Sequence, residues 1–133
     1  MELRVFLSTA ITGVHEDEYN NICKFVETTI RNEYDALREE DTVTITSNFF
    51  EIHTPDVKHK KLHHLEKALN KMKDCDIFFL LQEADGSTKP GCLVELSAWI
   101  SAEDAVQPIV RKKPKDWKYW RTLQDSKGKS EEL

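Results

Sequence analysis

The chain has no apolar run that approaches the ~20 residues needed to cross a bilayer as a helix. Its first residues, MELRVFLSTAITG, hold a short apolar stretch that ends in a turn. A secretory signal peptide would need a longer hydrophobic segment and a small-residue cleavage site. We therefore expect a cytoplasmic protein that has no membrane partner.

Cysteine is scarce, and the three residues of this type, Cys23, Cys75 and Cys92, are widely spaced without a C-x-x-C pair. This spacing argues against a disulfide framework and against a zinc site. Cys23 and Cys75 lie in segments with a regular apolar pattern. We expect these two side chains to fill small spaces in the core.

Basic residues are in the minority, with 19 Lys and Arg against 24 Asp and Glu and a net charge of −5. This balance argues against binding to a nucleic-acid polymer. The basic stretches 58–61 and 111–118 are interrupted by apolar or acidic residues, which is typical of solvated surface. His59 and His63 are four residues apart, but no carboxylate is fixed opposite them, so we predict no metal site.

Apolar strand-like segments alternate with amphipathic stretches along the whole chain. With 133 residues, of which 39% are hydrophobic, the chain has the size and composition of one globular domain. Apolar residues such as Ile22, Val26 and Ile30 recur at helical spacing, whereas Thr42 to Ser47 alternates polar and apolar residues. The expected strands cover residues 3–8, 42–47, 76–81 and 106–110, and the expected helices cover residues 15–39, 55–74, 90–103 and 117–123.

This alternation predicts an α/β fold, a flavodoxin-like or Rossmann-like three-layer sandwich with a parallel sheet of four to five strands. We expect one domain over residues 1–123 and a disordered polar tail over residues 124–133. The loops that follow the first and third strands meet at the carboxyl edge of such a sheet. Residues 8–13 and 82–91 should therefore face one another across a pocket.

Glu95 is the strongest candidate for chemistry. Its neighbours at helical spacing, Cys92, Leu96 and Trp99, are apolar or weakly polar, so it does not lie on an obvious solvated face. Burial would raise its pKa, and the start of the helix one turn away would lower it. An anion in a partly dry site is what a carboxylate nucleophile requires. The alternative is a charge that complements the helix end and points to water.

Two loops are candidates for binding a ligand. The turn STAITG offers hydroxyl groups and backbone N–H groups, which suit phosphate or sugar hydroxyls, but it lacks the G-x-G-x-x-G pattern of dinucleotide sites. The loop from Glu83 to Gly91 brings several polar side chains together. Ordinary turn chemistry is the alternative for both loops. The predicted substrate-binding residues are Ser8, Thr9, Ala10, Ile11, Thr12, Gly13, Asp85, Ser87 and Gly91.

Three segments together resemble the nucleoside 2-deoxyribosyltransferase superfamily, which includes the deoxynucleoside 5′-monophosphate N-glycosidases. RVFLSTAITG is similar to the opening strand and sugar-binding turn of that family, and KALNKMKDCDIFFLL to its helix and third strand. GSTKPGCLVELSAWISAEDAVQPIV is similar to the block that carries the family's glutamate. The resemblance covers roughly residues 3–110.

This resemblance implies a flavodoxin-like fold in which Glu95 attacks C1′ of a 2-deoxyribosyl group and expels the base. Another base or water then takes the sugar, as in retaining glycosidases. It also implies a small nucleoside or nucleotide as the ligand and no metal or organic cofactor. Members of this superfamily complete their pockets with a neighbouring subunit, which implies a homodimer or a larger homo-oligomer.

One departure from the family pattern concerns the group that assists the leaving base. The family carries an Asp eight positions before the Asp of the third strand, and counting back from Asp76 gives Ala68. A general acid contributes about 10²–10⁴-fold to the rate, so its loss would leave a feeble enzyme or none. Glu51, Asp85 and His64 are alternative donors between which the sequence does not choose.

A second departure is Thr12, which stands where the monophosphate-specific branch has an Arg before the turn glycine. Without that phosphate clamp, the sequence favours nucleosides or another ribosylated ligand. Ser97 replaces a helix glycine, which is a small change. Two further readings stay open: a binding or sensing module that has lost catalysis, supported by Ala68, and a glutamate-using NAD glycohydrolase.

Overall fold

A computed structural model describes residues 1–11, 14–48 and 61–115, with the backbone alone over residues 61–65. Strands and helices alternate along these residues, as the sequence predicts. None of the described helices has both the length and the apolar character needed to cross a membrane. The elements are β1 (Glu2–Ser8), α1 (Glu16–Glu33), β2 (Thr42–Thr46), α3 (Lys61–Met72), β3 (Ile77–Gln82), α4 (Pro90–Ile100) and β4 (Ile109–Lys112).

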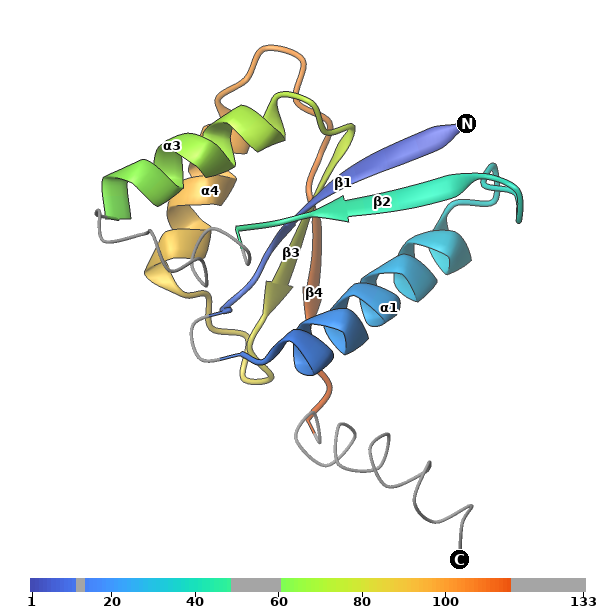
Figure 1. Ribbon diagram of the computed structural model, residues 1–133, viewed down its shortest axis with the longest axis horizontal. Coiled ribbons are helices and arrows are strands. Elements are labelled where there is room, and N and C mark those ends of the chain that lie inside the picture. The colour runs from blue at the N-terminus through green and yellow to red at the C-terminus, as the bar shows by residue number, and fades with distance from the viewer. Residues whose placement is uncertain (12–13, 49–60, 116–133) are drawn as a thin grey trace, which may run out of the picture.

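All four strands are parallel and lie in the order β2-β1-β3-β4 (Figure 1). The chain first steps outward from β1 to β2 and then crosses back to place β3 on the other side of β1. The direction of winding therefore reverses between β1 and β3. Open α/β sheets bind their ligands outside the carboxyl ends of the strands at such a switch point. The predicted flavodoxin-like α/β fold with a parallel sheet of four to five strands is confirmed, and four strands lie within the described residues.

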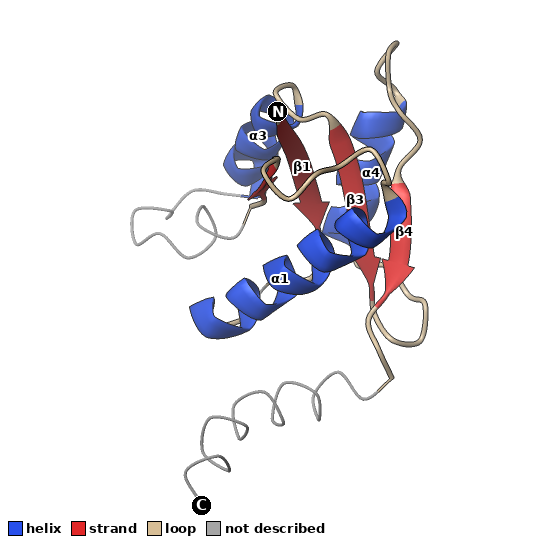
Figure 2. Ribbon diagram, turned by 90° about the vertical axis from the view of Figure 1, so that its right-hand side faces the viewer, coloured by secondary structure: helices blue, strands red, loops and turns tan. Residues whose placement is uncertain are grey.

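Helix α1 covers one face of the sheet, and α3 and α4 cover the other (Figure 2). Successive side chains of a strand point to opposite faces, so β1 sends Leu7 toward α1 and Phe6 toward α4. Ser8 follows this alternation and faces α4. The core on the α1 side contains Val5, Leu7, Ile11, Tyr19, Ile22, Val26, Ile30, Ile77, Phe79, Leu81 and Ile109. The core on the α3–α4 side contains Phe6, Ala68, Met72, Phe78, Leu80, Cys92 and Trp99.

Several element boundaries differ from the prediction by one to three residues, and two differences, at the end of α1 and the start of β4, have a clear physical reason. Helix α1 ends at Glu33 rather than residue 39, although Tyr34 and Leu37 still pack against its core. Both side chains pack against this core from the segment that follows the helix, so their spacing in the sequence resembled that of helical residues. Strand β4 begins at Ile109 rather than residue 106, because Pro108 has no N–H for the sheet and the carbonyl of Val106 accepts the indole N–H of Trp99 at 2.8 Å.

Other predictions lie outside the described residues. These are the start of the third predicted helix at residues 55–60, the last helix at 117–123 and the disordered tail at 124–133. The predicted extent of the domain over residues 1–123 stays a prediction for the same reason.

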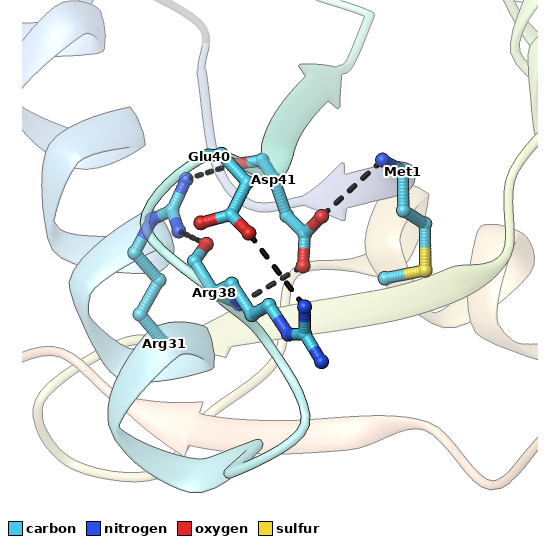
Figure 3. A network of polar contacts seen from close by, with 5 residues as sticks. All are labelled: Met1, Arg31, Arg38, Glu40 and Asp41. Carbon is cyan, nitrogen blue, oxygen red and sulfur yellow. Dashed lines mark hydrogen bonds and ion pairs between the residues drawn. The ribbon is translucent and has the colours of Figure 1, made fainter.

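Asp41 ties the amino-terminal edge of the sheet to the loop that follows α1 (Figure 3). Its carboxylate contacts the amino group of Met1 at 3.2 Å and accepts the backbone N–H of Arg38 at 2.9 Å. These two hydrogen bonds lower the pKa of Asp41, that from Arg38 most. Arg31 donates to the carbonyl oxygen of Asp41 at 2.7 Å, and Arg38 also pairs with Glu40. The network fixes β2 beside β1 at the end opposite the switch point.

Candidate functional site

The carboxyl ends of β1 and β3 are joined by a side-chain hydrogen bond as well as by the backbone pairing of the sheet. Thr9 directly follows β1, and its hydroxyl donates to the carbonyl oxygen of Leu81 at 3.1 Å. Ser8 is the last residue of β1 and is only 1% exposed. The predicted ligand-binding turn, residues 8–13, therefore begins with residues that are buried at the carboxyl edge of the sheet.

Helix α4 is set beside this edge by a loop with its own internal hydrogen bonds. The Gln82 amide donates to the Thr88 hydroxyl at 3.0 Å, and the Glu83 N–H donates to the Ser87 carbonyl at 3.0 Å. Pro90 opens the first turn of the helix, a position that does not require its missing N–H. The loop thus fixes where α4 starts relative to β3.

Glu95 lies on the face of α4 that anchors the helix to the sheet. Cys92, Glu95 and Trp99 are the buried residues of α4, and their spacing of three and four residues places them on one side. Trp99 stacks at a tilt against Phe78 of β3, with ring centroids 5.7 Å apart. Packing of the apolar neighbours therefore carries the carboxyl group of Glu95 into the protein, where it is 8% exposed.

The hydroxyl of Ser8 donates to Oε1 of Glu95 at 2.6 Å, which joins β1 directly to α4. Burial raises the pKa of Glu95 to about 7, and the hydrogen bond from Ser8 offsets part of this rise. The reading that Glu95 points to water is wrong. Burial dominates over the expected lowering, so the folded protein holds the proton of Glu95 at pH values at which an exposed glutamate has lost it. Keeping the charge buried costs about 3 kcal/mol relative to the unfolded chain.

Cys92 lies beside Ser8 and Glu95, although the sequence indicated it only as a neighbour of Glu95. Burial raises the pKa of its thiol, against a lowering by a hydrogen bond with Ser8. Glu95 and Glu83 raise this pKa further, and Lys113 lowers it. The thiol is therefore protonated at neutral pH and is a poor nucleophile. The signal for its place was the spacing of three residues before Glu95.

The predicted residues of the first turn are divided between binding and packing. The hydroxyl of Ser8 donates to Glu95, and the hydroxyl of Thr9 donates to the carbonyl oxygen of Leu81. Ile11 is buried in the core on the α1 side, away from α4. Ala10, between them, is half-buried. The other two members of this turn, Thr12 and Gly13, lie outside the described residues.

The predicted residues of the second loop are exposed and form a turn. The carboxylate of Asp85 accepts the backbone N–H of Ser87 at 2.8 Å, around Gly86 with φ +86°. The hydrogen bonds with Ser87 lower the pKa of Asp85. Gly91 is exposed in the first turn of α4, with open space where a side chain would stand. Among the described contacts, none joins Asp85 or Ser87 to Glu95.

Lys113 is a charged residue of this edge that the sequence interpretation missed. It follows β4, its side chain is only 10% exposed, and its ammonium group contacts Glu83 at 3.4 Å. The stretch 111–118 was interpreted as solvated surface, and this interpretation is wrong for Lys113. A single lysine that turns inward leaves no periodic signal, so the sequence pattern could not have separated it from its exposed neighbours.

A cavity of about 600 Å³ lies between α3 and α4, toward the amino-terminal ends of the strands. It contains none of the predicted site residues, so it is not the pocket expected between residues 8–13 and 82–91. Its lining residues are Glu66, Leu69, Asn70, Met72, Lys73, Cys75, Ala98, Trp99, Ala102, Asp104 and Ala105.

Of the three alternative proton donors, Asp85 is the one whose side chain the structure describes, and it also describes Ala68, which stands where the resembling family has an Asp. Ala68 is fully buried in the core on the α3–α4 side, and Asp85 is exposed. Glu51 and the side chain of His64 lie outside the described residues. Within the described part of the chain, no three His, Cys, Asp or Glu residues are grouped so that they could hold a metal ion.

Comparison with known proteins gave no match to this chain, whether with family models, curated proteins or solved structures. The resemblance to the nucleoside 2-deoxyribosyltransferase superfamily therefore stays a prediction.

Because burial raises the pKa of Glu95, the folded state holds its proton more tightly than the unfolded chain does. Wild-type stability should therefore fall by about 3 kcal/mol as the pH rises from about 4 to 8 because of this group. Glu95→Gln keeps a hydrogen-bond acceptor for Ser8 without the charge. We expect the variant to match the wild type at pH 4 and to be more stable at pH 8, by urea unfolding.

The control is Ser97→Ala, an uncharged substitution on the exposed side of α4. Its stability difference from the wild type should not change between pH 4 and pH 8, because neither side chain titrates in this range. A Glu95→Gln difference that is also independent of pH would show that the carboxyl group titrates as an exposed one.

Proposed function

We propose that this protein cleaves or transfers the N-glycosidic bond of a small nucleoside-like or nucleotide-like ligand, with Glu95 as the nucleophile. The observation that carries the proposal is a buried carboxyl group, held by Ser8 at 2.6 Å, at the carboxyl end of β1. This is the switch point at which folds of this class bind ligands. The family resemblance of residues 3–110 supports the same chemistry.

The proposed reaction has two displacements. The ionised carboxylate of Glu95 attacks the anomeric carbon, and the C1′–N bond breaks with its electron pair going to the base. Water or a second base then attacks the same carbon and releases Glu95. A carboxylate in a largely dry site is poorly solvated, which leaves its lone pairs available. The carboxylate supplies the chemistry, so the proposal needs no metal or organic cofactor.

A second candidate is a module that binds a nucleotide-derived ligand without turnover. It is favoured by Ala68, which lies in the core at the position where the resembling family has an Asp. Such a module would retain the switch-point site and lack assistance to the leaving base. Ligand-dependent thermal stabilisation without release of base would support this candidate.

The enzyme proposal predicts that the protein releases free base from at least one member of a panel of nucleosides, nucleotides and NAD. Only ionised Glu95 can attack, so kcat/KM should rise with pH through about 7 and then level off. Glu95→Gln should lower the rate by at least about 10³-fold, because the nucleophile is lost. Chromatography of the released base measures both effects.

Ser97→Ala, on the exposed side of the same helix, is the control and should retain the wild-type rate. Base release that persists in Glu95→Gln, or a rate that is highest below pH 6, would contradict the role of Glu95 as an anionic nucleophile.

The outer side of α4 supports the predicted self-association. Leu93 and Ile100 are seven residues apart, which places them on one side of the helix, and they are 48% and 58% exposed. Val94 beside them is 47% exposed. A helix that is apolar on its outer side as well as its inner side is typical of an interface. We therefore propose a second copy of the chain as its partner.

Replacement of Leu93 and Ile100 by Glu should dissociate this assembly, because it would place carboxylates in an apolar contact. Light scattering after size-exclusion chromatography should show an oligomer for the wild type and a monomer for the double variant. Asn32→Glu, on the exposed side of α1, is the control and should leave the assembly intact. A wild type that is monomeric at all concentrations would overturn this proposal.

A further inference from the structure

We propose that the cavity between α3 and α4 binds a small, planar aromatic molecule that carries a positive charge. This site is separate from the one proposed above, because the cavity lies toward the amino-terminal ends of the strands and Glu95 lies at their carboxyl ends. The inference goes beyond the proposed function and does not depend on it.

The cavity exists because small side chains face larger ones across the two helices (Figure 1). Leu69 and Met72 of α3 form one wall, and three alanines, Ala98, Ala102 and Ala105, lie on the wall formed by α4 and the segment after it. Protein interiors are otherwise close-packed, so alanines at such a contact leave space unfilled. The volume of about 600 Å³ lies within the range of about 300–1,000 Å³ that is typical of small-molecule sites.

Polar groups surround the opening of the cavity, and apolar groups line its interior. Glu66, Leu69, Asn70 and Lys73 of α3 all contribute to the lining, and their spacing of three and four residues places them on one side of the helix. Leu69 is half-buried, whereas the three polar residues are exposed. An apolar interior with a few polar groups around it is the usual composition of a site for a small organic molecule.

Trp99 supplies an aromatic wall whose orientation is already fixed. Its indole N–H donates to the carbonyl oxygen of Val106 at 2.8 Å, and its ring packs against Phe78 with centroids 5.7 Å apart. A ligand that contacts this side chain therefore does not have to immobilise it. An indole wall favours a planar aromatic ligand, which it contacts by stacking or edge to face, and it also attracts cations.

The charges of the lining favour a cationic ligand over an anionic one. Glu66 on α3 and Asp104 in the segment after α4 contribute two carboxylates, and Lys73 contributes one ammonium group, so the described lining has a net charge of −1. The thiol of Cys75 adds no charge, because burial raises its pKa to about 11. A positively charged group on the ligand therefore complements the lining.

The test uses three probes that share an indole ring and differ in the group at the end of a two-carbon chain. Tryptamine carries an ammonium group, tryptophol a hydroxyl and indole-3-propionate a carboxylate. Each probe is titrated at pH 7 into ¹⁵N-labelled protein, and the amide and indole signals are followed by NMR. Trp99→Phe assigns the indole signal of Trp99.

We expect tryptamine to shift the signals of Leu69, Ala98 and Trp99 along a curve that saturates. Tryptamine should bind at least about fivefold more tightly than tryptophol, and indole-3-propionate should bind most weakly. Ala102→Phe fills the cavity from an exposed position and should abolish the binding of all three probes. The circular dichroism and NMR spectra of this variant establish that it is folded.

Removal of a lining charge should affect the cationic probe alone. Asp104→Asn and Glu66→Gln should each weaken tryptamine binding by about two- to fivefold and leave tryptophol binding unchanged. Glu103→Gln is the matched control, because it removes an exposed carboxylate that adjoins Asp104 in the chain but does not line the cavity. This variant should bind both probes as the wild type does.

The inference would be overturned if none of the probes gave a saturable shift, or if the shifted signals lay away from the cavity. Equal affinities for tryptamine and tryptophol, or tighter binding of indole-3-propionate, would contradict the preference for a cation. None of these outcomes bears on the proposed role of Glu95, because the probes are not N-glycosides.

Discussion

The hydrogen bond between Ser8 and Glu95 joins the centre of the sheet to the helix that covers it, and it stabilises a charge that is buried. One hydroxyl donor offsets only part of the cost of taking a carboxylate out of water, so the pKa of Glu95 stays near 7. A group in this state is poised between its neutral and charged forms. The chemistry proposed for this protein depends on that balance.

The packing of β1 and α4 holds Ser8 and Glu95 in place. Alternation along β1 buries Phe6 and turns Ser8 to the same side, while Cys92 and Trp99 anchor the face of α4 that carries Glu95. The Trp99 indole is fixed in turn by the carbonyl of Val106. Apolar packing therefore supplies the free energy that keeps an unfavourable carboxyl group inside the protein.

The fold followed from the sequence because its signals are local and repeated. Alternating strands and amphipathic helices of sufficient length lead to a parallel sheet with helices on both faces. The sequence left two readings of Glu95 open, and the structure bears out the buried one, to which the apolar residues at helical spacing pointed. The ends of α1 and β4 did not follow, because Leu37 packs without a helix and Val106 uses its carbonyl on Trp99. Such tertiary contacts cannot be predicted from the local propensities of the sequence.

The partners of the site were harder to predict than its central residue. Ser8 was expected to bind a ligand, whereas its hydroxyl is used on Glu95, 87 residues further along the chain. Asp85 was expected in the ligand cradle and instead closes an exposed turn with Ser87. A sequence shows which residues can form hydrogen bonds, but the pairing of distant residues is decided by the register of the sheet and the placement of α4.

The ionisation of Glu95 can be measured directly by NMR, from the ¹³C shift of its side-chain carboxyl as the pH is raised, with Glu95→Gln used to assign the signal. The account predicts a midpoint of about 7, well above that of an exposed glutamate. A midpoint in the ordinary range of glutamate, near 4.5, would contradict the buried and partly neutral carboxyl group on which the account depends.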